Sequence, residues 1–535
     1  MDKLSNAFRM KTVVVLFLAV IMVGLGLQQA GAASGKKVLR IALDAADIKS
    51  LDPGFSHGTM DTAHHDLLYN GLLRFKTGDI TVIEPDLAER YEISKDGMEL
   101  TFYLRKGVMT HPFEGHPNGV EFTAEDAVFS IKKSGNPKFS TYSVTYKNFI
   151  PEAIDKYTVK VRLKERLPGP ERYFIDYRGA FMVPKKPFET IGAARFKTNP
   201  VGTGPFRLVK YIPGQKTVLA AHEKYFRGRP RLDGVEVWLM ADVSSREFAL
   251  RKGEVDVIEG VREQPWIDKM KKLPNVVVDV FGPGEINHLS FNVTKKPFDN
   301  PLVRRAMAYA ISRDELRTFI GRDASGPMCS VVPPFLPGGL SCEEVEKKGL
   351  LFTCDREKAK KLLAQAGYPN GFKMEQVITE RASYRRATEN LQSQFKKVGV
   401  DMKLKLVDHP TYHKMIRQGV NPYTMYICMR PNADIFLTWF FHSDSIVVTG
   451  KHPVTNFSHC TIIDDLVEKA RVETDKEKQI QMWKEAGYKL MENNISYAMY
   501  VLRFVFARNE RVKWGYDQKT TLNLYTQISE VTDIE

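Results

Sequence analysis

Cysteine is scarce in this chain of 535 residues, which holds five of them and no CxxC pair. The missing pairs exclude the usual zinc-knuckle arrangement, in which two close cysteine pairs hold one ion. In an oxidising compartment one or two disulfides could form, and we expect Cys342–Cys354 because this pair brackets a short polar loop. The odd number leaves at least one free thiol in the monomer. The five are Cys329, Cys342, Cys354, Cys428 and Cys460.

Long charged runs and long apolar runs are also missing. The formal net charge is +14, but the basic residues are scattered and no run of five occurs. Nucleic-acid binding needs a focused basic patch, so we expect no nucleic-acid partner. An attraction to acidic ligands or anionic membrane surfaces remains compatible with this charge. Beyond residue 33 no apolar run reaches 18 residues, which argues against a later transmembrane helix.

Catalytic motifs are present only as fragments. Residues 54–58 match GxSxG, but Pro53 breaks the chain where a nucleophile elbow needs a strand. An SxxK match at 130–133 follows a KTG match at 76–78, the reverse of the order in penicillin-recognising enzymes, and HExxH is absent. We therefore expect no catalytic residue and no enzyme activity. An exported hydrolase using Ser56 or Ser130 is the remote alternative.

The N-terminus has the three parts of a secretory signal peptide. Lys3, Arg9 and Lys11 precede an apolar stretch at 13–27, and small residues follow at 30–33. Fifteen apolar residues are short for a membrane span of about 20, although an uncleaved anchor is the alternative. No cysteine follows the stretch to carry a lipid. We predict a cleaved signal peptide at 1–33 and a soluble, exported mature chain.

Strand and helix patterns alternate along the rest of the chain, which predicts a mixed α and β class. Apolar residues alternate at 289–293, as in a strand. Asn300 and Pro301 then suit the start of a helix whose apolar face recurs through 303–311. A chain this long exceeds a single hydrophobic core, so we expect at least two domains.

Seven segments in a fixed order carry a family resemblance. The chain resembles the bacterial extracytoplasmic solute-binding proteins of the peptide, opine and nickel uptake class (family 5), which deliver ligands to ABC importers. The segments are SLDP (50–53), PDLAERYEISKDGMELTFYLRKGV (85–108), FTAEDAVFSI (122–131), VGTGPFRLVKYIPG (201–214), the stretch 289–316, DREKAKKLLAQAGYPNGF (355–372) and LQSQFKKVGVDMKL (391–404).

The resemblance implies an α/β fold, the two-lobed periplasmic binding protein of type II, in its large class with an extra subdomain. Lobe I would comprise 34–284 plus 503–535, with 54–199 as the extra subdomain, and lobe II would comprise 285–502. The chain would cross between lobes near 281–283 and 501–505. A ligand would be buried between lobes that close about this hinge.

The resemblance also places a recognition loop, in which peptide binders carry an aspartate for the ligand α-ammonium. Met429 stands at that aspartate position here, and a thioether cannot pair with a buried ammonium. Either Asp434 substitutes, or the ligand has no α-ammonium at this point. Arg430 favours a carboxylate, phosphate or carbonyl. The alternative is a shifted register with Arg430 in solvent.

Three more ligand-binding candidates follow. Arg381 lies near the position where dipeptide binders of this class hold a carboxylate with arginine; the alternative is a solvated arginine before a helix. Trp439 begins a run of three aromatic residues that suits a cleft wall, and at least one of the three should be core. His57 falls in the first cleft loop. We expect no bound metal, because the neighbouring His64 and His65 point in different directions on a helix.

These observations predict a non-catalytic, monomeric periplasmic binding protein without a cofactor. Its ligand would be a peptide or a peptide-like, opine-like or otherwise anionic small organic molecule. Its protein partner would be the permease of an ABC transporter in the inner membrane, in a system for peptide transport. A nickel-chelate or haem carrier of the same fold is the alternative.

Overall fold

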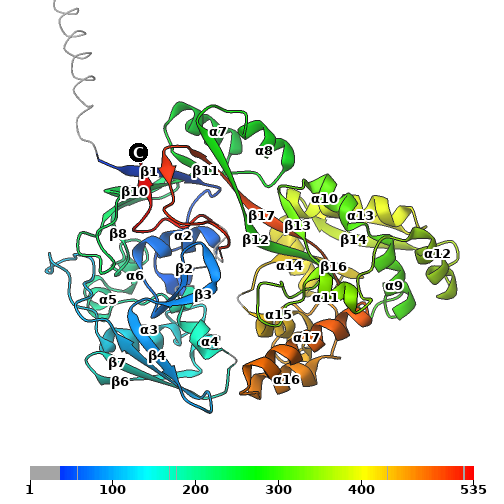
Figure 1. Ribbon diagram of the computed structural model, residues 1–535, viewed down its shortest axis with the longest axis horizontal. Coiled ribbons are helices and arrows are strands. Elements are labelled where there is room, and N and C mark those ends of the chain that lie inside the picture. The colour runs from blue at the N-terminus through cyan, green and yellow to red at the C-terminus, as the bar shows by residue number, and fades with distance from the viewer. Residues whose placement is uncertain (1–35, 57, 168, 176–177, 431, 522–524) are drawn as a thin grey trace, which may run out of the picture.

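The computed structural model describes residues 36–535 except 57, 168, 176–177, 431 and 522–524. The predicted signal peptide and the candidate His57 therefore lie outside the described residues. Figure 1 shows two lobes joined by a pair of long strands. We call the lobe that carries β1 lobe I and the lobe that carries α13 lobe II.

The joining strands belong to a nine-stranded sheet. Its order is β16-β12-β17-β11-β1-β10-β9-β8, with β13 paired to β17. Strand β12 (Val276–Phe291) runs antiparallel to β17 (Ser496–Asn509), from the pair Val276 and Asn509 to the pair Ser290 and Ser496. At about 3.3 Å per residue, a strand of this length reaches roughly 50 Å. One sheet therefore extends through both lobes.

The ladder between β12 and β17 is interrupted midway. Its register shifts between Phe281 and Glu285, opposite Phe504 and Leu502. Gly284 lies in the shift with a φ of +80°, and a Cβ there would stand 2.1 Å from the Leu502 carbonyl oxygen. Only glycine fits such a position. The crossing points and lobe boundaries predicted from the sequence remain predictions, and this irregularity is a structural reason to place a hinge here.

Lobe I combines the strands around β1 with a smaller antiparallel sheet of order β4-β5-β7-β6. Strand β1 pairs in parallel with β10 on one side and β11 on the other. The elements are β1 (Val38–Leu43), α2 (Thr59–Leu68), β2 (Leu73–Lys76), β3 (Asp79–Pro85), β4 (Ala88–Ile93), β5 (Glu99–Leu104), α3 (Ala124–Ser134), α4 (Ser143–Tyr146), β6 (Phe149–Asp155), β7 (Thr158–Leu163), α5 (Lys185–Ile191), α6 (Ala193–Phe196), β8 (Phe206–Ile212), β9 (Lys216–Ala221), β10 (Gly234–Leu239), α7 (Val243–Lys252), β11 (Val257–Glu259), α8 (Gln264–Met270), β18 (Val512–Lys513) and β19 (Asp533–Ile534).

Lobe II is richer in helices. A parallel pair, β14 and β15, lies beside the end of the long sheet formed by β12, β16 and β17. The elements are α9 (Pro301–Ala310), α10 (Arg313–Ile320), β13 (Ser325–Pro327), α11 (Cys342–Lys347), α12 (Arg356–Gln365), β14 (Lys373–Thr379), α13 (Ala382–Lys396), β15 (Asp401–Val407), α14 (His409–Arg417), β16 (Tyr423–Cys428), α15 (Ala433–Phe441), α16 (Asp464–Val472) and α17 (Lys476–Glu492).

The helix predicted after Asn300 is confirmed as α9. The Asn300 side chain accepts a hydrogen bond from the backbone N–H of Leu302, and Pro301 occupies the first turn. The face predicted to be apolar is buried through Val303, Ala306 and Met307. A cap, a proline and a three-to-four-residue apolar period were therefore sufficient to predict this helix.

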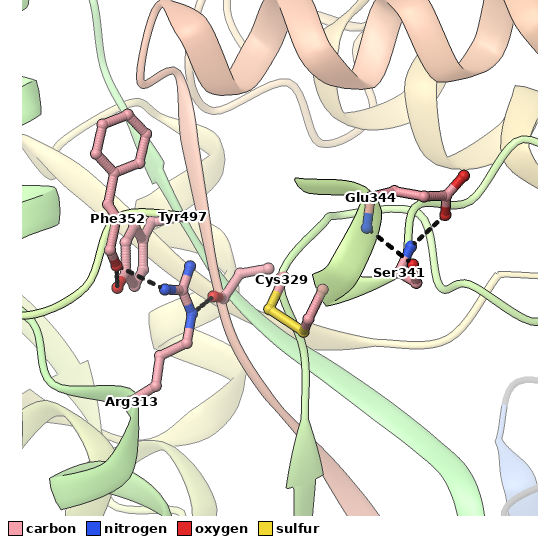
Figure 2. Close-up of a disulfide and its surroundings, with 8 residues drawn as sticks. Arg313, Cys329, Ser341, Glu344, Phe352 and Tyr497 are labelled. Carbon is pink, nitrogen blue, oxygen red and sulfur yellow. Dashed lines mark hydrogen bonds between the residues drawn. A yellow bond between two sulfur atoms is a disulfide. The ribbon is translucent and has the colours of Figure 1, made fainter. Parts of the chain in front are cut away.

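The disulfide prediction was wrong. The bridge joins Cys329 to Cys342 (Figure 2), with Cα atoms 5.2 Å apart. Cys354 is free and exposed. The residues after Cys342 form helix α11 rather than the expected loop. Its first turn is closed by hydrogen bonds between Ser341 and Glu344. The helix carries the chain away from Cys342 before Cys354 is reached.

Candidate functional site

A cavity of about 700 Å³ lies between the two lobes, where the paired strands β12 and β17 pass from one lobe to the other. We call it the interlobe cavity. Lobe I contributes the end of β1, the start of α2, α7 and the segment after β11, while lobe II contributes α13, α14 and the end of β16. The polar and aromatic lining includes Asp44, Asp242, Arg246, Glu259, Arg262, Glu263, Glu285, Arg381, Tyr384, Arg386, His409, His413, Tyr426 and Tyr500. A volume of this size suits a small organic ligand.

Three of the four arginines in the lining have a structural task. Arg246 is buried and donates to the backbone carbonyls of residues 240, 241 and 259, with Asp44 at 3.4 Å. Arg262 pairs with Glu285 at 2.7 Å, and Arg386 pairs with Glu263 at 2.5 Å. Arg381 is different, since no described residue forms an ion pair or a hydrogen bond with its guanidinium.

One of these ion pairs joins the lobes at the edge of the cavity. Glu263 precedes α8 in lobe I, whereas Arg386 is on α13 in lobe II. Beside them, Gln264 donates to Asp323 at 3.0 Å and accepts from its backbone N–H at 2.9 Å. The two lobes are therefore in direct polar contact along this edge of the cavity.

The lobe I wall carries acidic groups. Glu259 accepts a hydrogen bond from the backbone N–H of Asp44 at 3.0 Å. Burial raises the pKa of Glu259, because removing a carboxylate from water disfavours its charged form. Asp242 caps α7 by accepting from the backbone N–H of Ser245.

Only some of the predicted site residues line the interlobe cavity. Arg381 lines the cavity, at the N-terminal end of α13. Met429 and Arg430 come just after β16, and neither lines the cavity. The Arg430 guanidinium lies over the Trp439 ring at 5.0 Å and donates to the Met429 carbonyl at 2.7 Å. Asp434 is buried and accepts from Arg471 at 3.0 Å, so its charge is already matched.

The aromatic run after the recognition loop is mostly core, as expected for at least one member. Phe440 and Phe441 are fully buried, whereas Trp439 is only partly covered. His64 and His65 are also fully buried, with burial lowering the pKa of both imidazoles. Among the described residues, no three histidine, cysteine or acidic side chains gather as metal ligands would.

His409 and His413 were missed by the sequence reasoning. They lie four residues apart on α14, which begins after the capping residue Asp408, and both line the cavity. The i, i+4 spacing was visible in the sequence and places two side chains on one helical face. Which way that face points depends on packing against β14 and β16, so the spacing alone could not reveal the site.

No helix in the described part of the chain is long and apolar enough to cross a membrane. The described chain thus forms two lobes around a polar, partly aromatic cavity that contacts both. This architecture defines a class of ligand-binding proteins that enclose a solute between two lobes.

Comparison with known proteins gives the family. "Bacterial extracellular solute-binding proteins, family 5 Middle" matches residues 82–446. Heme-binding protein A of Haemophilus influenzae is 30% identical over 460 residues, covering 80% of each chain. The dipeptide-binding protein of Escherichia coli is 30% identical over 468 residues, covering 81% of this chain and 83% of its own.

Solved structures agree over almost the whole chain. The periplasmic binding protein MoaA of A. tumefacien R10, in complex with mannopinic acid, superposes with a TM-score of 0.77 at 33% identity. That match covers 94% of this chain and 100% of MoaA. HbpA2 of Haemophilus parasuis superposes with a TM-score of 0.80 at 25% identity, covering 93% and 100%. The chain belongs to family 5 of the bacterial extracellular solute-binding proteins, and the predicted two-lobed α/β fold is confirmed.

Proposed function

We propose that this chain is the periplasmic substrate-binding component of an ABC importer. It captures a peptide, or a peptide-like or opine-like organic acid, in the interlobe cavity and delivers it unchanged to the permease. The mature protein acts as a soluble monomer after removal of residues 1–33. Closure of the lobes about the shift in the β12–β17 ladder buries the ligand.

The observation that carries this proposal is the unpaired guanidinium of Arg381. The three other arginines of the cavity are held by carboxylates, while Arg381 has no such partner among the described residues. A guanidinium can grip a carboxylate through two parallel hydrogen bonds. An acidic ligand would supply the counter-ion that the protein itself does not.

Three relatives support the same ligand chemistry. One is a dipeptide-binding protein, and another was solved with mannopinic acid. A third, DppA of Helicobacter pylori, was solved with the peptide STSA and matches with a TM-score of 0.75 at 27% identity. A carboxylate is common to peptides and to organic acids of this kind, which suits an arginine anchor.

The test is to identify the ligand and then remove its anchor. Mass spectrometry of ligand released from the purified protein should find a carboxylate-bearing molecule, and calorimetry should measure its affinity. Arg381→Ala should weaken binding at least tenfold. Arg385→Ala is the matched control, since Arg385 is exposed on the same helix outside the cavity and faces Glu389 at 3.7 Å. Equal affinity of Arg381→Ala and the control would contradict the proposal.

A further inference from the structure

The cavity wall next to Arg381 is made of four rings. Tyr384, His409, His413 and Tyr426 all line the cavity. The centroids of His409 and His413 are 4.4 Å apart at 78°, Tyr384 lies 5.5 Å from His409, and Tyr426 lies 5.7 Å from His413. Tilted and edge-to-face contacts of this kind stabilise aromatic groups against one another. We call these four residues the ring wall.

Hydrogen bonds define which nitrogen of each imidazole carries the proton. Arg417 can only donate, so its Nη1, 3.3 Å from His413 Nδ1, leaves the His413 proton on Nε2. That Nε2 then donates to His409 Nε2 at 3.1 Å. The His409 proton is consequently on Nδ1, 3.2 Å from Thr379 Oγ1.

The chain of hydrogen bonds ends on a carboxylate. Thr379 Oγ1 donates to Glu380 Oε2 at 3.3 Å and accepts from the backbone N–H of Arg381 at 3.2 Å. All four imidazole nitrogens therefore have protein partners. The two histidines offer a ligand their ring faces and C–H edges, with no spare donor or acceptor.

The surroundings also keep both imidazoles uncharged near pH 7. Burial and Arg381 lower the pKa of His409, against the opposing effect of Glu380. Burial, His409, Arg417 and Arg381 together lower the pKa of His413 to about 4. The titratable and charged groups facing the pair are Arg417 and Tyr412 from α14, Glu380 and Arg381 from the β14–α13 connection, Tyr384 from α13 and Tyr426 from β16.

We propose that the ring wall is the subsite for an uncharged, apolar or aromatic side chain next to the ligand carboxylate. The inference rests on the proposed function, since Arg381 holds that carboxylate. A wall whose four imidazole nitrogens all have protein partners gains by covering apolar surface. A ligand ammonium or guanidinium there would lie near the guanidiniums of Arg381 and Arg417. The neighbouring carboxylate of Glu380 does not line the cavity and accepts from Thr379 and from the backbone N–H of His409. The cavity carboxylates Glu263 and Glu285 are held by arginines, and Asp44, Asp242 and Glu259 are on the facing lobe.

The HxxxH spacing has a competing interpretation as a metal site. Two Nε2 atoms 3.1 Å apart on one helical face could share a transition-metal ion. The proton on His413 Nε2 and the two nearby guanidiniums oppose a cation, so the ring wall is favoured. Binding of NiCl2 is therefore an outcome of the test.

The binding test uses calorimetry on the full mature chain with the dipeptides Ala-Phe and Ala-Lys at pH 7.5. Ala-Phe should bind at least tenfold more tightly than Ala-Lys. His413→Glu, which adds a carboxylate to the wall, should narrow this ratio at least fivefold, whereas His413→Phe should keep it. His452→Glu, at an exposed histidine outside the cavity, is the control and should change nothing.

A ligand-free measurement tests the hydrogen-bond chain separately. Long-range 1H–15N spectra of the 15N-histidine-labelled protein should show His413 as the Nε2–H tautomer, uncharged down to pH 6. Arg417→Gln should raise the pKa of His413. Titration of wild-type His413 near pH 6.5 would overturn the inference. So would equal or absent binding of Ala-Phe and Ala-Lys, or stoichiometric NiCl2 binding lost in His409→Gln and His413→Gln.

The two proposals fail separately. If a co-purified carboxylate ligand depends on Arg381 but Ala-Phe has no advantage over Ala-Lys, the ring-wall inference falls and the proposed function stands. If Arg381→Ala leaves binding of the co-purified ligand unchanged, the proposed function falls, and the ring-wall inference falls with it even where the spectra show the expected tautomers.

Discussion

Glu263 and Arg386 form an ion pair at 2.5 Å between the two lobes, at the edge of the interlobe cavity. Their side chains are 31% and 26% exposed, so water screens the pair only in part. Because the partners belong to different lobes, we expect the pair to separate when the lobes open. The side chains of Glu263 and Arg386 would then contribute to the free energy of lobe closure.

Removing this pair should favour opening. A partly exposed ion pair contributes about 0.5–1 kcal/mol, so Glu263→Gln should weaken ligand binding roughly two- to five-fold. Small-angle X-ray scattering should show a larger radius of gyration for the variant at the same ligand concentration. Asp314→Asn is the matched control, since Asp314 pairs with Arg322 within lobe II. Unchanged affinity and scattering in Glu263→Gln would show that the pair does not contribute to closure.

Gly284 should be intolerant of a side chain. Its φ is +80°, and an added Cβ would stand 2.1 Å from the Leu502 carbonyl oxygen. Gly253, at the end of α7, has a φ of +71° but no atom near its Cβ position. Gly253→Ala should cost about 1 kcal/mol for the backbone conformation alone, and Gly284→Ala should cost distinctly more. Thermal unfolding measures both, and equal losses would contradict the clash at the β12–β17 shift.

Acid should destabilise the protein through its buried histidines. Burial lowers the pKa of His65, His111 and His288 to about 3. Neighbouring groups raise or lower these pKa values by smaller amounts. In the unfolded chain each would titrate near 6.5. Below that pH the unfolded state binds more protons than the folded state, so the free energy of unfolding falls as pH falls towards 3.

Urea unfolding between pH 7.5 and 5 measures how steeply the free energy of unfolding changes with pH. Each such histidine contributes at most about 1.4 kcal/mol per pH unit below its unfolded pKa. Replacing one of them, as in His111→Gln, should reduce the slope, whereas replacing the exposed His452 should leave it unchanged. A free energy of unfolding that stays constant from pH 7.5 to 5 would contradict the buried neutral state.

The cysteines should differ in reactivity. Native protein treated with iodoacetamide should be labelled at Cys354, which is exposed, while the buried Cys428 and Cys460 react only after unfolding. Burial raises the pKa of Cys428 to about 12 and that of Cys460 to about 11, so few thiolates exist at neutral pH. Peptide mapping without reductant should find Cys329 linked to Cys342. A peptide linking Cys342 to Cys354 would contradict the structure.

Features that depend on a few neighbouring residues could be predicted from the sequence, whereas features that depend on distant packing could not. The α9 helix follows from Asn300, Pro301 and the apolar period, all within a few residues. Arg381 was predicted through the family resemblance; the structure places it in the cavity lining, and its role in binding stays a prediction. The disulfide partner of Cys342 depended on whether the following residues form a loop or a helix, and short capped helices such as α11 are easily missed.

The ring wall and the contact between Glu263 and Arg386 were beyond the sequence for a different reason. Tyr384, His413 and Tyr426 come from three elements that meet only after lobe II has packed. Glu263 and Arg386 come from different lobes, so their contact depends on how the whole chain is arranged. Side-chain spacing on one helix predicts a shared face, but not the neighbour that the face meets.

We propose that the lobes close on an acidic solute, held by Arg381, and leave it unaltered. Native mass spectrometry of the protein purified from its own host tests this most directly. We expect a one-to-one complex with a carboxylate-bearing molecule whose mass stays constant on incubation, and loss of that complex in Arg381→Ala. A bound molecule that is converted to product, or a complex that persists in Arg381→Ala, would contradict this proposal.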